Sequence, residues 1–462
     1  MLYWFVFNRH KNTQNVLLLV ASYYFYSCWD WRFLFLLLFS TGLDYFTAIK
    51  IEKSTTSRNK KFWFWLSVGI NLGFLGVFKY YDFFATSFAS LLEGFGFHAN
   101  PLLLNLILPV GISFYTFHGL SYIIDIYKDR IKAETNFVDY SLFVSYFPLL
   151  VAGPIERATH LLPQVKKRRS FQSEKAIDGL NQIVWGLFKK VVIADSCAVY
   201  VNTIFDNYET QNSLTLLIGG IYFAFQIYGD FSGYSDIALG TSKLFGIDLL
   251  KNFNYPYFSR DIAEFWRRWH ISLSTWFKDY LYIPLGGSKG GTWMKVRNTF
   301  IIFLVSGFWH GANWTFIVWG GLNALYFIPL LLTEKNRNNI DVVAYGRSFP
   351  TVREFFSMIA TFFLTVIAWV FFRAENVSKA FFYLKQMFSF NLEGGLEYLS
   401  IDRYSIEIIP LIVFFVLFEW HCRTKEHPFT GKKSFLKLII ILLSLLLFGV
   451  YSQANDFIYF QF

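Results

Sequence analysis

DIAEFWRRWHISLSTWFKDYLYIPLGGSKGGTWMKVRNTFIIFLVSGFWHGANWTFIVW, residues Asp261–Trp319, holds two histidines among apolar and aromatic side chains. His270 and His310 each follow a tryptophan in this stretch. An imidazole titrates near neutral pH, and at the depth of hydrocarbon it costs free energy unless it faces protein or a water-filled path. The two histidines are therefore a candidate functional site, and the apolar residues around them indicate a membrane protein.

The composition of the whole chain supports the same fold class. Of its 462 residues, 54% are hydrophobic, 22% are aromatic and 16% are charged, whereas about 25% of the residues in a soluble domain are charged. Apolar runs of about 18 to 22 residues recur along the chain, and each can cross a bilayer as a helix. We expect an all-α polytopic membrane protein with one membrane domain over residues 1–462, because no long polar stretch offers a second domain.

The charged and sulfur-bearing residues exclude several other classes. The formal net charge is +10, but lysines and arginines form short clusters between apolar runs, as cytoplasmic loops require. We therefore expect no nucleic-acid partner. The 3 cysteines lie far apart without a CxxC spacing, so neither a zinc site nor a disulfide framework follows. Residues 1–7 are apolar and lack a signal-peptide cleavage site, so we expect an uncleaved N-terminus.

The apolar runs predict the order of the helices. Two short segments are expected to differ from simple spans: 83–98 along the membrane surface, and 137–154 as a re-entrant or shallow helix broken by prolines. The stretch 300–332 is expected to be one span with a break at Gly311, and the tail 455–462 to end on the outer face. The helical runs, of which the first is a hairpin with its tip at residues 29–32, are expected at 14–50, 62–82, 101–127, 176–205, 213–240, 300–332, 355–372, 405–420 and 435–452.

The segment FWRRWHISLSTWFKDYLYIPLGG, residues 265–287, combines cationic and aromatic side chains. In a helix, Arg267 and His270 are three residues apart and share a face with Glu264. Because arginine matches phosphate oxygens, a groove formed by Arg267 and Arg268 at the cytoplasmic face would suit a phosphate-bearing donor. The alternative is an interfacial helix that Trp and Arg anchor at the membrane surface.

The segment VSGFWHGANW, residues 305–314, carries the second histidine. Gly307 and Gly311 allow a close approach of neighbouring backbones, and the Asn313 amide could orient the imidazole of His310. The alternative is a histidine that serves packing alone. Taken together, two histidines favour acyl transfer, because an imidazole can take a proton from a hydroxyl and return it to a leaving group. GxSxG, HExxH and P-loop motifs are absent, so direct transfer without a protein-bound acyl intermediate is expected.

Five segments in order carry a family resemblance. The chain resembles the membrane-bound O-acyltransferase superfamily, and within it the bacterial alginate O-acetyltransferase branch, to which the teichoic-acid D-alanyltransferases are related. The resemblance is strongest over residues 105–325. The segments are LPVGISFYTFHGLSYIIDIY (108–127), VAGPIERATHLLPQ (151–164), FQIYGDFSGYSDIALGTSKLFGI (225–247), FNYPYFSRDIAEFWRRWHISLSTWFKDYLYIPLGG (253–287) and SGFWHGANW (306–314).

The resemblance implies a fold of about ten to twelve transmembrane or re-entrant helices around a central tunnel. It implies that His310 is the catalytic histidine and His270 a second important residue of the same tunnel. Two departures stand out: His118 occupies the place of an expected glutamine, and the N-terminus lacks the full apolar helix usual in this branch. The substrate-binding residues expected from these motifs are Trp266, Arg267, Arg268, Asp236, Trp309 and Asn313.

The function predicted from these features is O-acyl transfer across a bacterial cytoplasmic (inner) membrane. No bound cofactor is expected; the donor substrate would be acetyl-CoA or an acyl carrier, and the acceptor a cell-surface polysaccharide or a periplasmic acetyltransferase partner protein. D-alanyl transfer to teichoic acid and peptidoglycan O-acetylation stay open within the same fold. From other classes, a transporter or flippase of acyl or glycan precursors and a scaffold subunit also stay open. The absence of a clear internal repeat counts against a secondary transporter.

Overall fold

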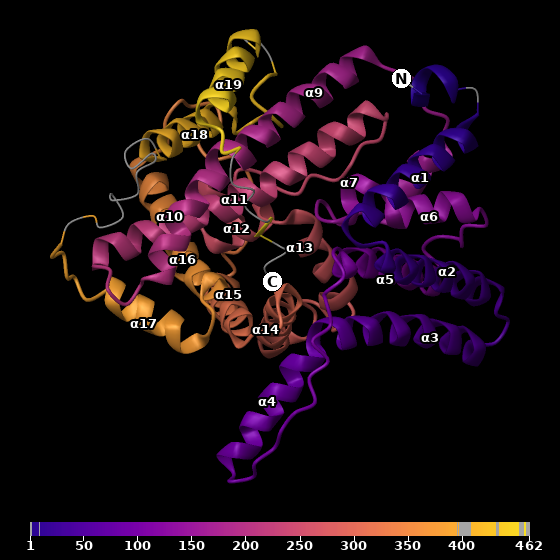
Figure 1. The fold of residues 1–462 in the computed structure, drawn as a ribbon, viewed down its shortest axis with the longest axis horizontal. Helices are drawn as coiled ribbons and strands as arrows, with labels where there is room; N and C mark the ends of the chain where they lie inside the picture. Colours follow the sequence, from indigo (N-terminus) through magenta and orange to yellow (C-terminus); the bar gives the residue numbers. More distant parts are fainter. Residues whose placement is uncertain are drawn as a thin grey trace. The chain divides into compact units, whose positions relative to one another are not determined.

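The computed structural model describes residues 2–8, 10–394, 396, 408–430, 434–451 and 457–458. The regular secondary structure of these residues is helical, with no strand among them (Figure 1). Within these described residues, five helices are long and apolar enough to cross a membrane: Arg32–Lys53, Ser57–Gly94, Ser213–Leu244, Trp314–Leu332 and Val352–Arg373. The expected all-α polytopic fold is confirmed. Most of the expected outer tail, 455–462, lies outside the described residues.

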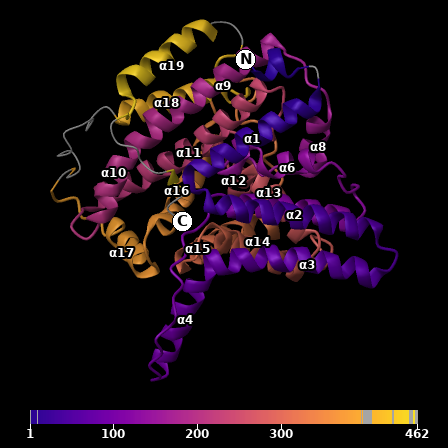
Figure 2. The same cartoon turned by 45° about the vertical axis from the view of Figure 1, so that its right-hand side comes forward.

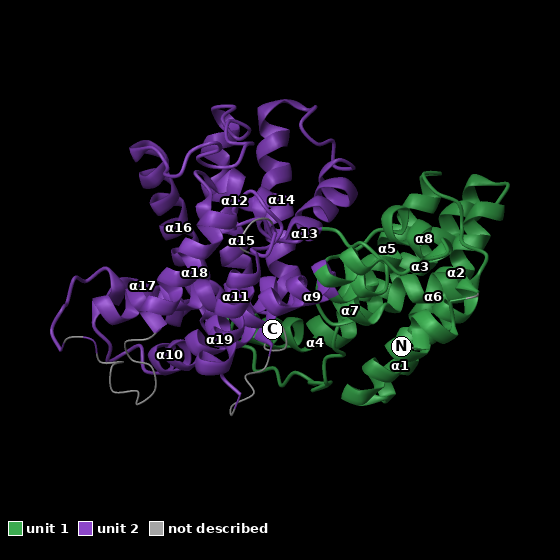
Figure 3. Cartoon of the chain, turned by 90° about the horizontal axis from the view of Figure 1, so that it is seen from above, with its two compact units in different colours: residues 1–177, 241–250 green, residues 178–240, 251–462 purple. Residues whose placement is uncertain are grey.

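The chain divides into two compact units (Figure 3). Unit 1 comprises residues 1–177 and 241–250, and unit 2 comprises residues 178–240 and 251–462. The expectation of one membrane domain over residues 1–462 and of a central tunnel stays a prediction.

Unit 1 begins with a short π-helical turn, Leu2–Val6, and the expected hairpin of α1 (Lys11–Asp30) and α2 (Arg32–Lys53). The helix α3 (Ser57–Leu75) runs beside α2 and continues through a π-helical turn into α4 (Tyr81–Gly94), which leads away from them (Figure 2). The Asp82 carboxylate accepts hydrogen bonds from the backbone N–H groups of Leu104 (2.8 Å) and Asn105 (3.0 Å), so the returning chain is tied to α4. Because α4 continues to Gly94, the helical run from Ser57 extends beyond its predicted end at residue 82.

The predicted span 101–127 is wrong in its first part. The helix α5 comprises only Ile112–Tyr127, and residues 101–109 form neither a helix nor a strand. Pro109 disfavours a helical conformation of the residue before it, and Gly111 adopts the left-handed region with φ 75°. Pro109 and Gly111 both disfavour helix at their positions, so α5 begins after them, at Ile112.

The predicted broken segment 137–154 consists of α6 (Phe137–Ser145) and α7 (Phe147–Leu150), followed by α8 (Ala158–Lys166). Pro148 supplies no N–H to continue the ladder of α6, although it fits the first turn of a new helix. The chain is extended at Tyr146 with ψ 114°, between the two helices. The break is thus confirmed, and the position of this segment relative to the membrane stays a prediction.

In unit 2, the glycines of the run 225–240 lie where helices pack closely. The helices α9 (Ser173–Leu187) and α10 (Asp195–Asp206), joined by a π-helical stretch, confirm the run 176–205, and α11 (Ser213–Leu244) confirms the run 213–240. A Cβ atom on Gly233 would lie 2.8 Å from the carbonyl oxygen of Gly186. Small residues at such a crossing let two helices pack backbone to backbone.

The predicted single span 300–332 is a hairpin of two helices. The helix α14 comprises Gly291–His310, and α15 comprises Trp314–Leu332. Gly307 of α14 faces Phe316 of α15, while Gly320 of α15 faces Phe303 of α14, so the helices are antiparallel. The predicted break at Gly311 is therefore a reversal of the chain.

The rest of unit 2 follows the predicted order with one addition. Runs 355–372, 405–420 and 435–452 correspond to α16, α18 and α19, whereas the short amphipathic helix α17 was not predicted. The remaining elements of unit 2 are a 3₁₀ turn (Pro256–Phe258), α12 (Ile262–Arg268), α13 (Ile271–Phe277), a π-helical turn (Lys278–Tyr282), α16 (Val352–Arg373), α17 (Val377–Met387), α18 (Ile408–Cys422) and α19 (Ser434–Phe448).

The glycine contacts between α14 and α15 lead to a first prediction. A Cβ atom on Gly320 would overlap the carbonyl oxygen of Phe303, so we expect Gly320→Ala to lower the free energy of unfolding by about 1–3 kcal/mol. Gly321→Ala is the matched control, because its Cβ would lie 3.8 Å from the nearest atom, Leu304 Cδ2. Thermal unfolding of both variants in detergent measures the difference. Equal melting temperatures would contradict the close approach of α14 and α15.

Candidate active site

The predicted helix through Arg267 and His270 is broken between them. The helix α12 ends at Arg268, Trp269 is extended, and His270 adopts the left-handed conformation with φ 42° and ψ 55° before α13 begins. The backbone of a preceding loop holds this elbow: the N–H of Ile271 donates to the carbonyl of Asn252 (2.9 Å), and the N–H of Asn254 donates to the carbonyl of Arg268 (2.9 Å). The expected shared face of Arg267 and His270 is therefore wrong.

His270 is fully buried and bound by Asn252. Its Nδ1 lies 2.9 Å from the Asn252 side-chain oxygen, which also lies 3.4 Å from the backbone N–H of Ser272. Because a backbone N–H only donates, this contact indicates that the asparagine atom is the oxygen, and Nδ1 of His270 must donate to it. In the neutral ring, Nε2 then carries the lone pair. Nε2 is buried with no hydrogen-bond partner among the described residues, so it is available to accept a proton from a bound hydroxyl or water.

His310 is the last residue of α14 and is 4% exposed. Its ring packs edge-on against Trp319 of α15 and Phe372 of α16, with ring centroids 5.1 and 5.2 Å apart. Trp309 contacts both histidines: its centroid lies 4.9 Å from that of His310 and 6.1 Å from that of His270. The structure thus brings the two histidines into one aromatic cluster, although 40 positions separate them in the sequence.

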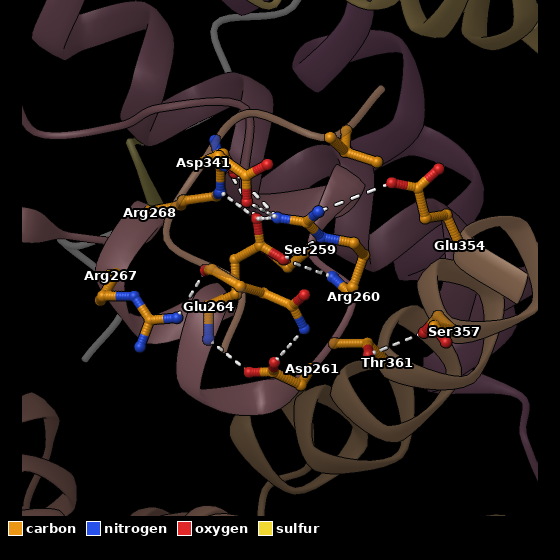
Figure 4. A network of polar contacts seen from close by, with 12 residues as sticks. Ser259, Arg260, Asp261, Glu264, Arg267, Arg268, Asp341, Glu354, Ser357 and Thr361 are labelled. Atoms are coloured by element: carbon orange, nitrogen blue, oxygen red, sulfur yellow. Dashed lines mark hydrogen bonds and ion pairs between the residues drawn. The ribbon is translucent and has the colours of Figure 1, made fainter. Parts of the chain in front are cut away.

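The two arginines next to His270 belong to a polar network around Glu264 (Figure 4). Glu264 is 1% exposed and accepts hydrogen bonds from Arg268 Nη2 (2.8 Å) and from Arg260 Nε (3.0 Å). Arg268 also donates to the carbonyl of Asp341 (3.0 Å). Arg267 donates to two backbone carbonyls, at 2.7 and 2.8 Å. Both arginines thus contact protein groups, with Arg268 buried and Arg267 exposed, and their expected part in a cationic groove for the donor stays a prediction.

Trp266 and Asn313 also make structural contacts. Trp266 is buried, and its indole N–H donates to the side-chain oxygen of Asn323 (3.2 Å). Asn313 caps α15: its side-chain oxygen accepts from the N–H of Thr315 (3.0 Å), and its amide nitrogen donates to the carbonyl of Glu375 (2.7 Å). This capping accounts for Asn313 without a part in orienting the imidazole.

Asp236 lines a small polar cavity of about 30 Å³, enough for one or two water molecules. The carboxylate of Asp236 forms an ion pair with Lys189 (2.5 Å) and accepts a hydrogen bond from Gln182 (2.9 Å). Asn252 lines the same cavity and donates to Ser235 (3.3 Å). The cavity is therefore connected to His270 through one asparagine side chain. Further lining residues with polar side chains are Tyr228, Lys251, Glu419 and Glu426.

The geometry can support proton transfer at two buried imidazoles. Within the part of the chain that the structure describes, no group of three or more His, Cys, Asp or Glu side chains is placed to hold a metal ion. The roles of all these residues in catalysis and binding stay predictions.

Comparison with known proteins decides the family. The profile described as MBOAT, membrane-bound O-acyltransferase family, matches residues 125–372. The chain is 41% identical over 382 residues to the probable alginate O-acetylase AlgI of Pseudomonas aeruginosa, a match that covers 82% of this chain and 70% of the relative. The chain belongs to the membrane-bound O-acyltransferase family. The predicted resemblance is confirmed, and the protein is a multi-pass membrane acyltransferase.

Two other relatives of this O-acyltransferase carry different names. The peptidoglycan O-acetyltransferase of Helicobacter pylori is 38% identical over 400 residues, which cover 81% of this chain and 73% of the relative. The teichoic acid D-alanyltransferase of Bacillus subtilis is 29% identical over 246 residues, which cover 50% of this chain and 61% of the relative. The family thus contains relatives named for acetyl and for D-alanyl transfer.

Three residues that line the cavity at Asp236 were not predicted from the sequence. Lys189 in LFKKVVI (187–193) and Glu419 in FFVLFEW (414–420) are ionisable groups inside apolar helical runs. Such groups are functional candidates by default, so they could have been found. Asn252 lies in a loop, KNFN, and nothing in its local sequence signals the contact with His270.

The hydrogen bond of Asn252 leads to a second prediction. We expect Asn252→Ala to lower acyl transfer by about tenfold or more, because His270 loses the acceptor that fixes its tautomer and ring orientation. Asn252→Asp should retain more activity, since a carboxylate still accepts from Nδ1. Nitrogen-15 NMR of labelled histidine provides a readout that a general packing defect would not move. A ring that keeps its Nδ1–H tautomer in the alanine variant would contradict this role for Asn252.

Proposed function

We propose that this O-acyltransferase moves the acetyl group of acetyl-CoA to a hydroxyl of an extracytoplasmic polysaccharide, with His310 as general base. The observation that carries the proposal is the buried cluster that unites His310 and His270 in a chain 41% identical to a probable alginate O-acetylase. The relatives named for alginate and peptidoglycan acetylation favour a polysaccharide acceptor. The cytoplasmic (inner) membrane of a bacterium is the location that fits these substrates.

In the proposed reaction, the acceptor hydroxyl attacks the thioester carbonyl while His310 takes its proton. Collapse of the tetrahedral intermediate breaks the C–S bond, and the imidazolium returns the proton to the departing thiolate of CoA. The oxygen–acyl bond of the ester forms, and no acyl group is held by the protein. The lone pair of His270 Nε2 would orient the acceptor hydroxyl or a water molecule next to it.

The test uses the purified protein in nanodiscs with radiolabelled acetyl-CoA and soluble alginate or peptidoglycan fragments. Formation of an alkali-labile acetyl ester on one of these polymers supports the proposal. Transfer without an ion gradient excludes a pure transporter or flippase. Transfer from a D-alanyl carrier protein, with none from acetyl-CoA, would overturn the acetyl donor.

A periplasmic partner that completes the transfer is the second part of the proposal. Its signature is an acetyl group that leaves acetyl-CoA but reaches the polysaccharide only when a periplasmic extract is added. Mass analysis of cell-surface glycans from cells with and without the protein identifies the acceptor in either case.

A further inference from the structure

Unit 1 contains a second, larger cavity, whose lining residues the candidate active site does not include. Its volume is about 460 Å³, within the range of small-molecule sites. It lies among Trp4, the end of α8, the start of α9 and the end of α11, and we call it the basic pocket. Five of its lining residues are lysine or arginine, and one is a carboxylate: Lys167, Arg168, Arg169, Lys175, Lys243 and Asp248.

Arg169 is the central feature of the basic pocket. Its side chain is buried, with 6% of the residue exposed. Nη2 contacts the Asn15 side-chain oxygen, and the guanidinium lies over the Tyr3 ring, 5.7 Å from the ring centroid. Nε and Nη1 are buried and have no hydrogen-bond partner among the described residues. A buried guanidinium with two unused donors is costly, and an anion that accepts from both would stabilise it strongly. The unused donors therefore point to an anionic ligand.

The other charges leave the basic pocket positive. Asp248 is already in an ion pair with Lys175 (2.7 Å). His160 also lines the cavity, and its hydrogen bond with Glu156 (2.8 Å) raises the pKa of the imidazole. Lys167 and Arg168 are exposed. By the rule that basic loops face the cytoplasm, this cavity opens on the side where a soluble phosphorylated donor is present.

Two aromatic rings complete the pocket. Trp4 and Phe171 line it with ring centroids 5.6 Å apart, and the indole N–H of Trp4 donates to the carbonyl of Leu244 (2.9 Å). Aromatic rings beside cationic side chains can stack on a nucleobase while the cations bind phosphates. By contrast, Arg267 and Arg268, which the sequence indicated for the donor, already bind protein groups.

We propose that the basic pocket binds the 3′-phosphate, diphosphate and adenine of the CoA donor, with Arg169 at its base and Lys167 and Arg168 at its mouth. This inference rests on the proposed function for the identity of the donor. The shared chemistry is a phosphorylated ligand, and anionic lipid headgroups present the same group. The experiment therefore contains arms for both sources.

The test compares acetyl-CoA with acetyl-pantetheine, which carries the same thioester but no phosphate, in nanodiscs of phosphatidylcholine. For the wild type we expect a much lower KM with acetyl-CoA. The double variant K167Q/R168Q, whose residues are exposed and do not threaten folding, should reduce this advantage by about tenfold or more. Arg169→Lys keeps the charge but removes the fork, and should act in the same direction. The double variant K335Q/R337Q removes the same charge from another exposed basic loop and should leave the ratio at the wild-type value.

Several outcomes would overturn the inference while leaving the proposed function intact. A wild-type ratio of the two KM values in K167Q/R168Q and in Arg169→Lys is one of them. A second outcome would assign the pocket to lipid: adding phosphatidylglycerol to the nanodiscs lowers the CoA affinity of the wild type, and the variants bind phosphatidylglycerol more weakly but bind CoA as the wild type does. If the wild type transfers from acetyl-pantetheine but shows no preference for acetyl-CoA, the pocket has no part in donor binding. If neither thioester is a donor, both the inference and the acetyl donor of the proposed function fail.

Discussion

His310→Ala is expected to lower acyl transfer by about 10²–10⁴-fold, the range typical of a lost general base. The imidazole lies at the end of α14 and is enclosed by Trp309, Trp319 and Phe372, so few other groups reach the same position. His310→Gln should be similarly inactive while filling more of the space. Initial rates of labelled acetyl transfer, at equal amounts of monodisperse protein, measure the effect.

His118→Gln is the matched control for this experiment. His118 is also fully buried, and its Nε2 accepts a hydrogen bond from the N–H of Glu156 (3.1 Å). A glutamine oxygen can accept the same bond, and glutamine is the residue that the family resemblance leads one to expect there. The control should retain the wild-type rate. Folded His310 variants with the wild-type rate would remove His310 from the mechanism.

Glu264→Gln is expected to lower the free energy of unfolding by about 3–5 kcal/mol, the cost of breaking a buried ion pair by removing one charge. Glu264 is the shared acceptor of Arg260 and Arg268 (Figure 4). In the glutamine variant, the Arg268 guanidinium stays buried without its counter-charge, whereas Arg260 keeps its ion pairs with Asp341 (3.1 Å) and Glu354 (3.6 Å). Because α12 precedes the elbow at His270, the same variant should also reduce acyl transfer.

Asp341→Asn provides the control for Glu264→Gln. The Asp341 carboxylate also pairs with Arg260 (3.1 Å), but its side chain is 70% exposed. We therefore expect a loss of at most about 1 kcal/mol. Thermal unfolding in detergent, with tryptophan fluorescence as the signal, compares the two. Similar melting temperatures for both variants would contradict the assignment of Glu264 as the centre of the network.

The length and polarity of apolar runs predicted most of the helices correctly. The cluster at residues 29–32 interrupts the run 14–50, and the structure turns there between α1 and α2. The hairpin of α14 and α15 was missed, although the run 300–332 is longer than one crossing of about 30 Å requires. Pro109 and Gly111 mark the start of α5, but hydropathy alone weighted the leucines before them as helix.

The site was predictable where a residue type was unusual for its surroundings and unpredictable where contacts are distant in sequence. His270 and His310 were predicted as site residues because they lie in an apolar stretch. The break at Trp269 and His270 did not, because its cause is the loop at Asn252, 18 residues upstream. Local spacing therefore predicted that Arg267 and His270 share one face of a helix, whereas contacts with the Asn252 loop end that helix at Arg268.

The left-handed backbone of His270, with φ 42°, has a consequence for how this position evolves. A residue with a side chain in that conformation is strained by about 1–2 kcal/mol relative to glycine. Glycine or asparagine at position 270 would relieve this strain and remove the imidazole at once. The ring also fills a buried space and donates to Asn252, and losing these contacts would cost more free energy than the strain. The contacts of the imidazole therefore maintain a backbone conformation that its own side chain disfavours.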